Sequence, residues 1–174
     1  GGDLPGKLII DERTTLTLDT HRALEGALNS ITTGGRGSTG RGIAAGYASH
    51  YERISITLKD LLSSDWEDKL RAHYQLYFSL ISGFPGGLAL SDMQVVTHTQ
   101  ITRPVGAVDI FIQRLQETRS ALRQYASSDA YHILESAWND LTIPITLEGA
   151  QGPGLDPFHG VYPDVTASRP MSRN

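Results

Sequence analysis

The chain has 174 residues, a formal net charge of −4, 18 glycines, 8 prolines and no cysteine. This length favours one domain with a sizeable core, and 39% hydrophobic with 20% charged residues argues against disorder of the whole. The lack of cysteine excludes disulfides, thiolate zinc sites and a thiol nucleophile. The acidic balance argues against nucleic-acid binding, and no apolar run approaches the roughly 20 residues that span a bilayer. We therefore expect a cytoplasmic protein with neither a nucleic-acid nor a membrane partner.

The first part of the chain predicts short regular elements around a glycine-rich loop. An apolar run after a Gly/Pro-rich start is typical of a buried strand, and five glycines in eleven residues fit neither helix nor strand. Asp19 or Thr20 is expected to cap the first helix. The expected elements are a strand at 7–11, helices at 18–29 and 43–51, and a loop at 32–42 between the helices.

Three longer helices are expected next. Ser64 with Glu67 matches a capping box and predicts the start of a helix that ends in the glycine-rich run 83–87. Apolar residues at spacings of three and four predict two more helices, at 105–125 and 129–139. The stripe on the last of these is formed by Tyr131, Leu134 and Trp138.

The remaining elements are a predicted strand, a turn and a segment left open. Residues 143–147 alternate and are apolar, which favours a strand, and Pro144 places it at a sheet edge or makes it a strand start. A turn follows at 148–152, whereas residues 93–99 fit either a strand or an extended loop.

Aromatic residues and histidines carry little functional signal. The aromatic stripe of the long helix is most simply core or subunit interface; its members are Trp66, Tyr74, Tyr77 and Phe78. The six histidines lack metal-ligand spacing, so no metal site is predicted; they are His21, His50, His73, His98, His132 and His159.

The first glycine loop matches two phosphate-binding patterns only superficially. Residues 35–40 spell G-x-G-x-x-G, but that fingerprint requires a strand immediately before it, and a helix precedes here. Residues 35–42 echo a P-loop, although Arg41 and Gly42 stand where Lys and Ser/Thr belong. Both patterns are therefore rejected.

Anion binding remains possible on physical grounds. Glycines let backbone N–H groups approach an anion, Ser38 and Thr39 add hydroxyl donors, and Arg36 and Arg41 add charge. The helix expected from residue 43 would turn its positive end to the same place. The alternative is an exposed loop that binds nothing.

The turn at 148–152 offers a second candidate site. It follows a predicted strand, where open α/β sheets place ligands. Gln151 carries both an amide donor and a carbonyl acceptor, which suits the edge of a heterocycle. A tight turn with polar caps explains the same residues equally well.

Together the two glycine loops resemble those of the adenylosuccinate synthetase family. Residues 37–43 read GSTGRGI against the family's G-T-T-G-R-G-I-G, and residues 147–152 read LEGAQG against its E-G-A-Q-G. The strand before the first helix also fits the family. The second motif continues as the family's does, with Leu155-Asp156, His159-Gly160, Tyr162-Pro163 and Val165-Thr166.

This resemblance implies the fold class and the reaction. It implies an α/β protein: the central, mostly helical segment of a P-loop-type nucleotide-binding parallel-sheet enzyme, with two strands flanking a helical insert. Its parts would be a strand, helix and nucleotide loop at 1–57, an insert with dimer contacts at 58–142, and a strand with a second nucleotide loop at 143–174. The implied activity, in purine biosynthesis, joins L-aspartate to the 6-position of IMP with GTP (or ATP) and Mg²⁺.

The resemblance also implies roles for individual residues. Thr39 and Thr166 would donate hydroxyl hydrogen bonds to the nucleotide phosphate, and Gln151 would contact the nucleotide. Arg53 would reach into the partner subunit's site of a homodimer as a bidentate phosphate fork. The supporting loop residues are Ser38, Gly40, Arg41 and Gly152.

No catalytic residue is predicted in this sequence. The family's G-D-E-G-K-G loop with the catalytic aspartate, and the catalytic histidine after it, have no counterpart here. The ligands of Mg²⁺ and of GTP are therefore expected largely outside the chain, and the chain alone is expected to be inactive.

Departures from the family pattern keep two alternatives open. Residues 44–46 read AAG where the family has G-P-A, and residues 169–172 read RPMS, which breaks the family's S-S-N-T-T continuation. One alternative is the bacteriophage branch of the family, which acts on dGMP to make 2-aminoadenylosuccinate. The other is a non-catalytic nucleotide-binding or dimerisation module.

Overall fold

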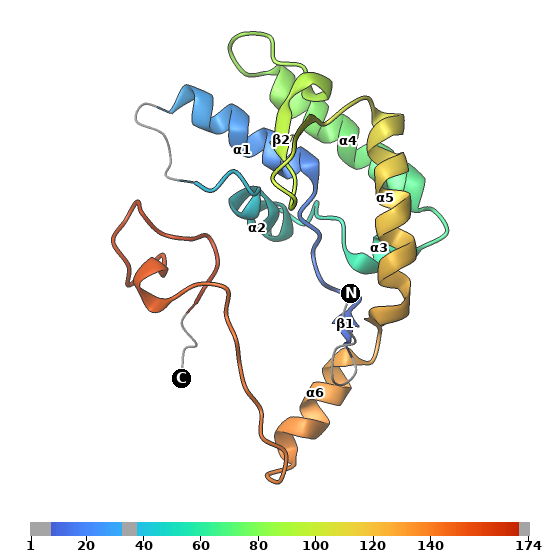
Figure 1. Cartoon of the computed structure of the whole chain (residues 1–174), viewed down its shortest axis with the longest axis vertical. Coiled ribbons are helices and arrows are strands. Elements are labelled where there is room, and N and C mark those ends of the chain that lie inside the picture. Colours follow the sequence, from blue (N-terminus) through green and yellow to red (C-terminus); the bar gives the residue numbers. More distant parts are fainter. Residues whose placement is uncertain (1–7, 33–37, 171–174) are drawn as a thin grey trace.

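The computed structural model describes residues 8–32 and 38–170 and is mixed α/β, with most regular structure in helices (Figure 1). Lys7 and Arg36, which the predicted strand and anion loop include, lie outside the described residues. Within the described ranges, no helix is both long and apolar enough to cross a membrane. The helices are α1 (Asp19–Ile31), α2 (Ile43–Tyr51), α3 (Leu58–Leu62), α4 (Trp66–Ser82), α5 (Val108–Leu122) and α6 (Ala130–Asn139), and the strands are β1 (Ile10–Asp11), β2 (Gln94–Val96), β3 (Thr102–Pro104) and β4 (Ala126–Ser127). Short 3-10 turns cover Leu90–Asp92, Arg123–Tyr125 and Pro153–Leu155.

Helix α4 lies at the centre of the hydrophobic core. Leu70 and Ile81 are fully buried on it, and α1, α3 and α5 pack against it. The aromatic stripe is core at Trp66, Tyr74 and Tyr77, as expected, whereas Phe78 is 41% exposed. Burying apolar area of this kind is the main stabilising contribution to the helical body.

Two small sheets flank this body. Strand β1 pairs in parallel with β4, with Ile10 opposite Ala126, and β2 pairs antiparallel with β3. The second pair shows that the open segment at 93–99 contains a strand. The first strand is shorter than expected and only half-buried, and Leu8 before it is 44% exposed.

The predicted strand at 143–147 is wrong. Those residues run as irregular chain, and β4 takes the place beside β1 that a second parallel strand would fill. Pro144 has no N–H to donate to a ladder, and no other strand of the described residues pairs with this stretch.

The expected helices are present, but two predicted starts are wrong. Leu18 precedes the first turn of α1, and its N–H donates to Nδ1 of His21 at 2.9 Å, so neither Asp19 nor Thr20 is the cap. Helix α4 begins after Asp65 rather than at a Ser64 capping box.

The capping box forms instead at α3, a helix that was not predicted. The side chains of Thr57 and Asp60 each accept from the other residue's backbone N–H. The helix is only five residues long, too short for apolar periodicity to show in the sequence.

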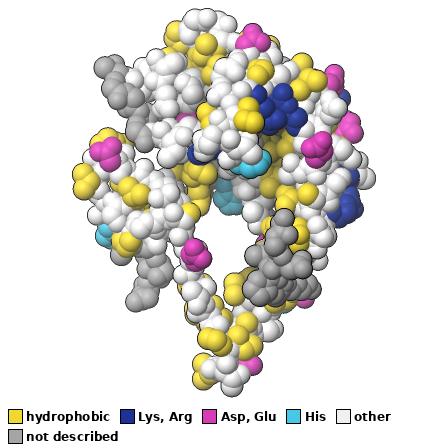
Figure 2. Space-filling view, viewed as in Figure 1, with side chains coloured by type: hydrophobic (Ala, Val, Ile, Leu, Met, Phe, Trp, Pro, Cys, Tyr) yellow, Lys and Arg dark blue, Asp and Glu magenta, His cyan; other side chains and the backbone are white. Residues whose placement is uncertain are grey.

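Helix α6 and the segment after it extend away from the helical body (Figure 1). No residue of α6 is buried, and its expected apolar stripe of Tyr131, Leu134 and Trp138 is 52–62% exposed. Beyond α6 the chain returns toward α2, and Figure 2 shows an opening between this returning segment and the body.

Candidate functional site

The loop before α2 is attached to two neighbouring elements. Ser38 Oγ accepts from the side-chain amide of Asn29 in α1 at 3.0 Å. On the other side, the guanidinium of Arg41 donates to the carbonyl of Thr97, just after β2, at 2.9 Å. Arg41 therefore positions the loop, a role that the sequence prediction of a free cation did not include.

Gly42 brings the loop against the backbone of α1. Its φ is +76°, in the left-handed region, and a Cβ there would lie 2.8 Å from the backbone nitrogen of Arg22. Its N–H donates to the carboxylate of Glu25 at 2.5 Å, and Glu25 is only 5% exposed. Glycine is required because both the backbone angle and the space exclude a side chain.

Glu25 is a site residue that sequence reasoning missed. Its carboxylate lies at the start of α2, where the helix dipole favours negative charge. The one signal in the sequence was an acidic residue between Ala23 and Ala27 on the buried face of the first helix. A buried carboxylate needs a partner, and the glycine loop supplies it.

Thr39 and Arg53 lie beyond opposite ends of α2. Both residues are exposed, and within the described chain neither side chain has a hydrogen-bond partner or an ion pair. The helix has nine residues and is therefore about 14 Å long. The structure does not bring these two predicted phosphate contacts together within one chain.

Arg53 has an unusual backbone conformation. Its φ is +63°, a region that residues other than glycine and asparagine rarely occupy. Its N–H donates to the carbonyl of His50, and the N–H of Ile54 donates to the carbonyl of Ser49. These two bonds form a Schellman motif, in which glycine is the usual residue at this position.

Asp156 organises the second loop. It is 3% exposed and accepts from the backbone N–H of Phe158 at 2.8 Å, from that of His159 at 3.1 Å, and contacts the His159 ring at 3.1 Å. The hydrogen bond from Phe158 is the largest cause that lowers the pKa of this carboxyl below its usual value. Asp156 is a second residue whose role sequence reasoning did not assign, although the matched motif contains it.

The same loop places Thr166 and excludes a side chain at Gly160. The N–H of Thr166 donates to the carbonyl of Leu155 at 2.8 Å, which closes the loop. A Cβ at Gly160 would collide with the carbonyl oxygens of Gly154 and Asp156. The loop is therefore held by its own backbone and by one carboxylate.

The predicted nucleotide contacts of the second loop are accessible. Gln151 and Gly152 are exposed, and the hydroxyl of Thr166 lies 3.1 Å from that of Ser168. Within the described residues no hydrogen bond joins this loop to residues 38–42, although Figure 1 places both on the α2 side of the molecule. The candidate site thus consists of two loops, the one before α2 and the one around Asp156, and each is held by its own hydrogen bonds.

A buried polar cluster connects α1, α2 and α4 beneath the site. His21 Nε2 lies 3.2 Å from Ser49 Oγ, and His73 Nε2 lies 2.8 Å from Thr20 Oγ1. Burial lowers the pKa of His21 to about 4 and is the main cause that lowers the pKa of His73 to about 3. Both rings are neutral near pH 7, so they act as hydrogen-bonding parts of the core.

The fold of the chain matches that of a solved adenylosuccinate synthetase. Fully ligated adenylosuccinate synthetase from Plasmodium falciparum superimposes with a TM-score of 0.73 at 17% identity, covering 94% of this chain and 34% of that one. This likeness confirms the expected α/β fold class.

The sequence comparisons identify the family. The family model for adenylosuccinate synthetase matches residues 2–174, so the chain belongs to the adenylosuccinate synthetase family. The adenylosuccinate synthetase of Chlorobaculum tepidum is 31% identical over 175 residues, covering 99% of this chain and 36% of that protein. That of Syntrophus aciditrophicus is 32% identical, covering 97% and 35%. The chain thus spans about a third of the length of these relatives.

Proposed function

We propose that this chain is the nucleotide-holding segment of an adenylosuccinate synthetase-type ligase. The parent reaction transfers phosphate from GTP to the 6-oxygen of IMP, and the amine of L-aspartate then displaces that phosphate. In this proposal the chain binds and orients the nucleoside monophosphate. The acid/base chemistry belongs to other parts of the enzyme.

The observation that carries the proposal is that both family motifs lie on organised, accessible loops. Glu25 and Asp156, each buried, hold the two loops by backbone N–H groups and leave Thr39 and Gln151 exposed and Thr166 half-buried. Thr39 and Thr166 would donate to phosphate oxygens, and Gln151 would hydrogen-bond the base or sugar. Preorganised donors lose little entropy when the ligand binds.

The length of α2 supports a dimeric site. Because Arg53 lies about a helix length of 14 Å from the Thr39 loop, it is unsuited to the phosphate bound by its own chain. A second copy related by two-fold symmetry would carry its Arg53 to that phosphate. The planar guanidinium then forms two parallel hydrogen bonds with the phosphate.

The described residues do not fit a Mg²⁺ site of their own. Nowhere in residues 8–32 and 38–170 do three or more His, Asp or Glu side chains gather to hold a metal ion. We leave the metal and GTP to other parts of the parent enzyme, and no step of the proposed role is routed through them.

Binding of nucleoside monophosphates to the chain tests the proposal. Calorimetry would compare IMP, GMP and dGMP with the wild type and with Arg53→Ala, and would use exposed Arg123→Ala as the matched control. Preferred IMP binding that Arg53→Ala weakens and Arg123→Ala does not supports the IMP ligase. Preference for dGMP supports the bacteriophage-type activity. A folded dimer that binds none of the three contradicts the proposal and favours an interaction module.

A further inference from the structure

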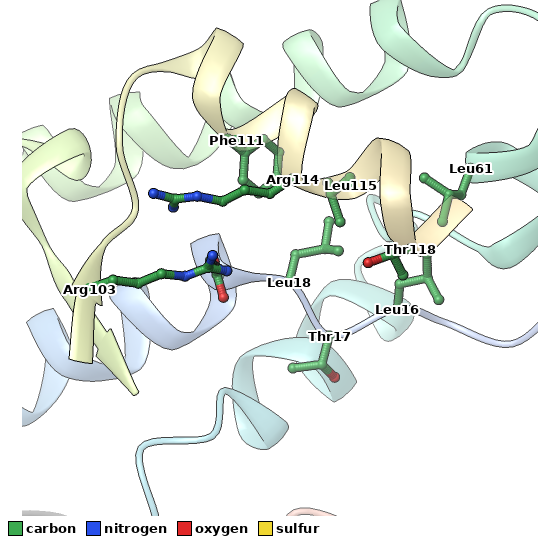
Figure 3. Close-up of a pocket in the computed structure, with 10 residues that line it drawn as sticks. Leu16, Thr17, Leu18, Leu61, Arg103, Phe111, Arg114, Leu115 and Thr118 are labelled. Atoms are coloured by element: carbon green, nitrogen blue, oxygen red, sulfur yellow. Dashed lines mark hydrogen bonds and ion pairs between the residues drawn. The ribbon is translucent and has the colours of Figure 1, made fainter. Parts of the chain in front are cut away.

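A pocket outside the nucleotide loops combines an apolar floor with cationic side chains (Figure 3). It has a volume of about 210 Å³ and lies between the chain before α1, helix α5 and strand β3. Leu18, Leu115 and Phe111 form part of its apolar wall, and Arg103 and Arg114 are its two basic residues. None of the residues predicted to hold nucleotide lines it.

The two arginines enter the pocket from opposite elements. In Figure 3, Arg103 extends from β3 toward the start of α1, where it pairs with Asp19, and Arg114 extends from α5 toward β3. Two guanidinium groups that line one small pocket repel each other, and a low-dielectric wall strengthens that repulsion. A bound anion would relieve it.

The protein offsets this positive charge only in part. Asp19 is shared, because its carboxylate pairs with Arg103 at 3.0 Å and with Arg22 at 3.1 Å. Arg114 donates to the carbonyls of residues 104 and 105 and forms no ion pair with any described carboxylate. Asp19, which also lines the pocket, therefore serves two guanidiniums, and Arg114 is left without a carboxylate partner among the described residues.

Two donors in this cluster lack a partner among the described residues, Nε of Arg22 and Nε of Arg103, and only Arg103 lines the pocket. Nε of Arg103 is buried and has no hydrogen-bond acceptor. Leaving a charged group's N–H unsatisfied is costly, and in native proteins such donors usually face a ligand or water. The unmatched donor therefore lies on Arg103, whereas the guanidinium without an ion pair is that of Arg114.

We propose that this pocket binds a small organic carboxylate with a short apolar body. The carboxylate would face Arg103 and Arg114, whose planar guanidiniums suit its two oxygens, and the apolar body would lie against Leu18 and Leu115. The volume is below the range of about 300–1,000 Å³ typical of drug-sized ligands, so the ligand has few atoms. The apolar wall favours such a molecule over an inorganic anion.

A ligand titration on the chain itself tests this site. The probes are butyrate, n-butanol as its uncharged counterpart, and inorganic phosphate, and the readout is the methyl NMR shifts of Leu18 and Leu115. Butyrate is expected to give saturable shifts in the millimolar range, and the other probes to bind at least about tenfold more weakly. Equal binding of n-butanol, tighter binding of phosphate, or no saturable shift with butyrate would each overturn the proposal.

Variants separate the site from general stability. Arg114→Gln and Arg103→Gln are each expected to weaken butyrate roughly tenfold or more, and Arg114→Lys to retain part of the binding because it keeps the charge. Arg123→Gln, an exposed arginine near the end of α5, is the control and should bind butyrate like the wild type. Retained wild-type affinity in both glutamine variants contradicts the site, and methyl spectra of the free variants verify their fold.

Discussion

Replacing Arg53 by glycine is expected to stabilise the fold while removing a ligand contact. The φ of +63° costs an ordinary L-residue about 1 kcal/mol that glycine does not lose. Arg53→Gly is compared with Arg53→Ala rather than with the wild type, because both variants lose the arginine side chain. The difference between them then contains only the relief of backbone strain and the larger entropy loss of glycine on folding. We expect Arg53→Gly to exceed Arg53→Ala in free energy of unfolding by about 1 kcal/mol, or about 2–4 °C in Tm.

Urea unfolding followed by circular dichroism measures this difference, with Glu52→Gly as the matched control. Glu52 has a right-handed φ of −76°, so glycine there should destabilise by up to about 1 kcal/mol. Both Arg53 variants should lose monophosphate binding equally. Equal stability of Arg53→Gly and Arg53→Ala would refute the assignment of strain, and retained binding in both would refute the role of the side chain.

Three further changes test the described interactions. Glu25→Gln should lower the free energy of unfolding by about 1–3 kcal/mol, because it weakens a buried charge-assisted bond to Gly42; an unchanged urea midpoint would contradict this. His21 and His73 have pKa values in the folded protein far below the unfolded value of about 6.5. The free energy of unfolding should therefore be highest above pH 6.5 and should fall as the pH drops toward 4, with a slope near 1.4 kcal/mol per pH unit for each histidine. A free energy of unfolding that stays constant from pH 7 to 5 would contradict this prediction. Asp156→Asn should speed amide hydrogen exchange at residues 158 and 159, because it weakens the hydrogen bonds that hold them. In the wild type the same faster exchange should appear only as the pH falls below about 4, since the pKa of the Asp156 carboxyl is lowered. Equal exchange rates in the variant and the wild type would show that the carboxylate does not hold the loop.

The sequence predicts the helices and the family well because those signals are long. All five expected helices are present near their predicted positions, and in the longer ones apolar spacing repeats over two or more turns. The two glycine motifs identified the family because residue type and order agree over many positions. Their predicted ligand contacts, such as Thr39 and Gln151, stay predictions of the resemblance.

The features that the sequence did not predict were missed for two physical reasons. A strand of two residues, such as β4, depends on a partner distant in sequence and leaves no alternating pattern. The buried carboxylates of Glu25 and Asp156 are defined by backbone N–H groups that approach them only in the folded chain. A carboxylate in the sequence looks the same whether it is solvated or holds a loop.

The fixed length of α2 has a consequence for how this protein tolerates insertions and deletions. Adding or removing one residue between Gly42 and Arg53 would shift the arginine by about 1.5 Å along the helix and turn it by about 100° around the axis. Because Gly42 is held against α1 and Ser49 is hydrogen-bonded to His21, the helix cannot slide or rotate to compensate. We therefore expect single-residue changes of length in α2 to be more damaging than most substitutions on its exposed face.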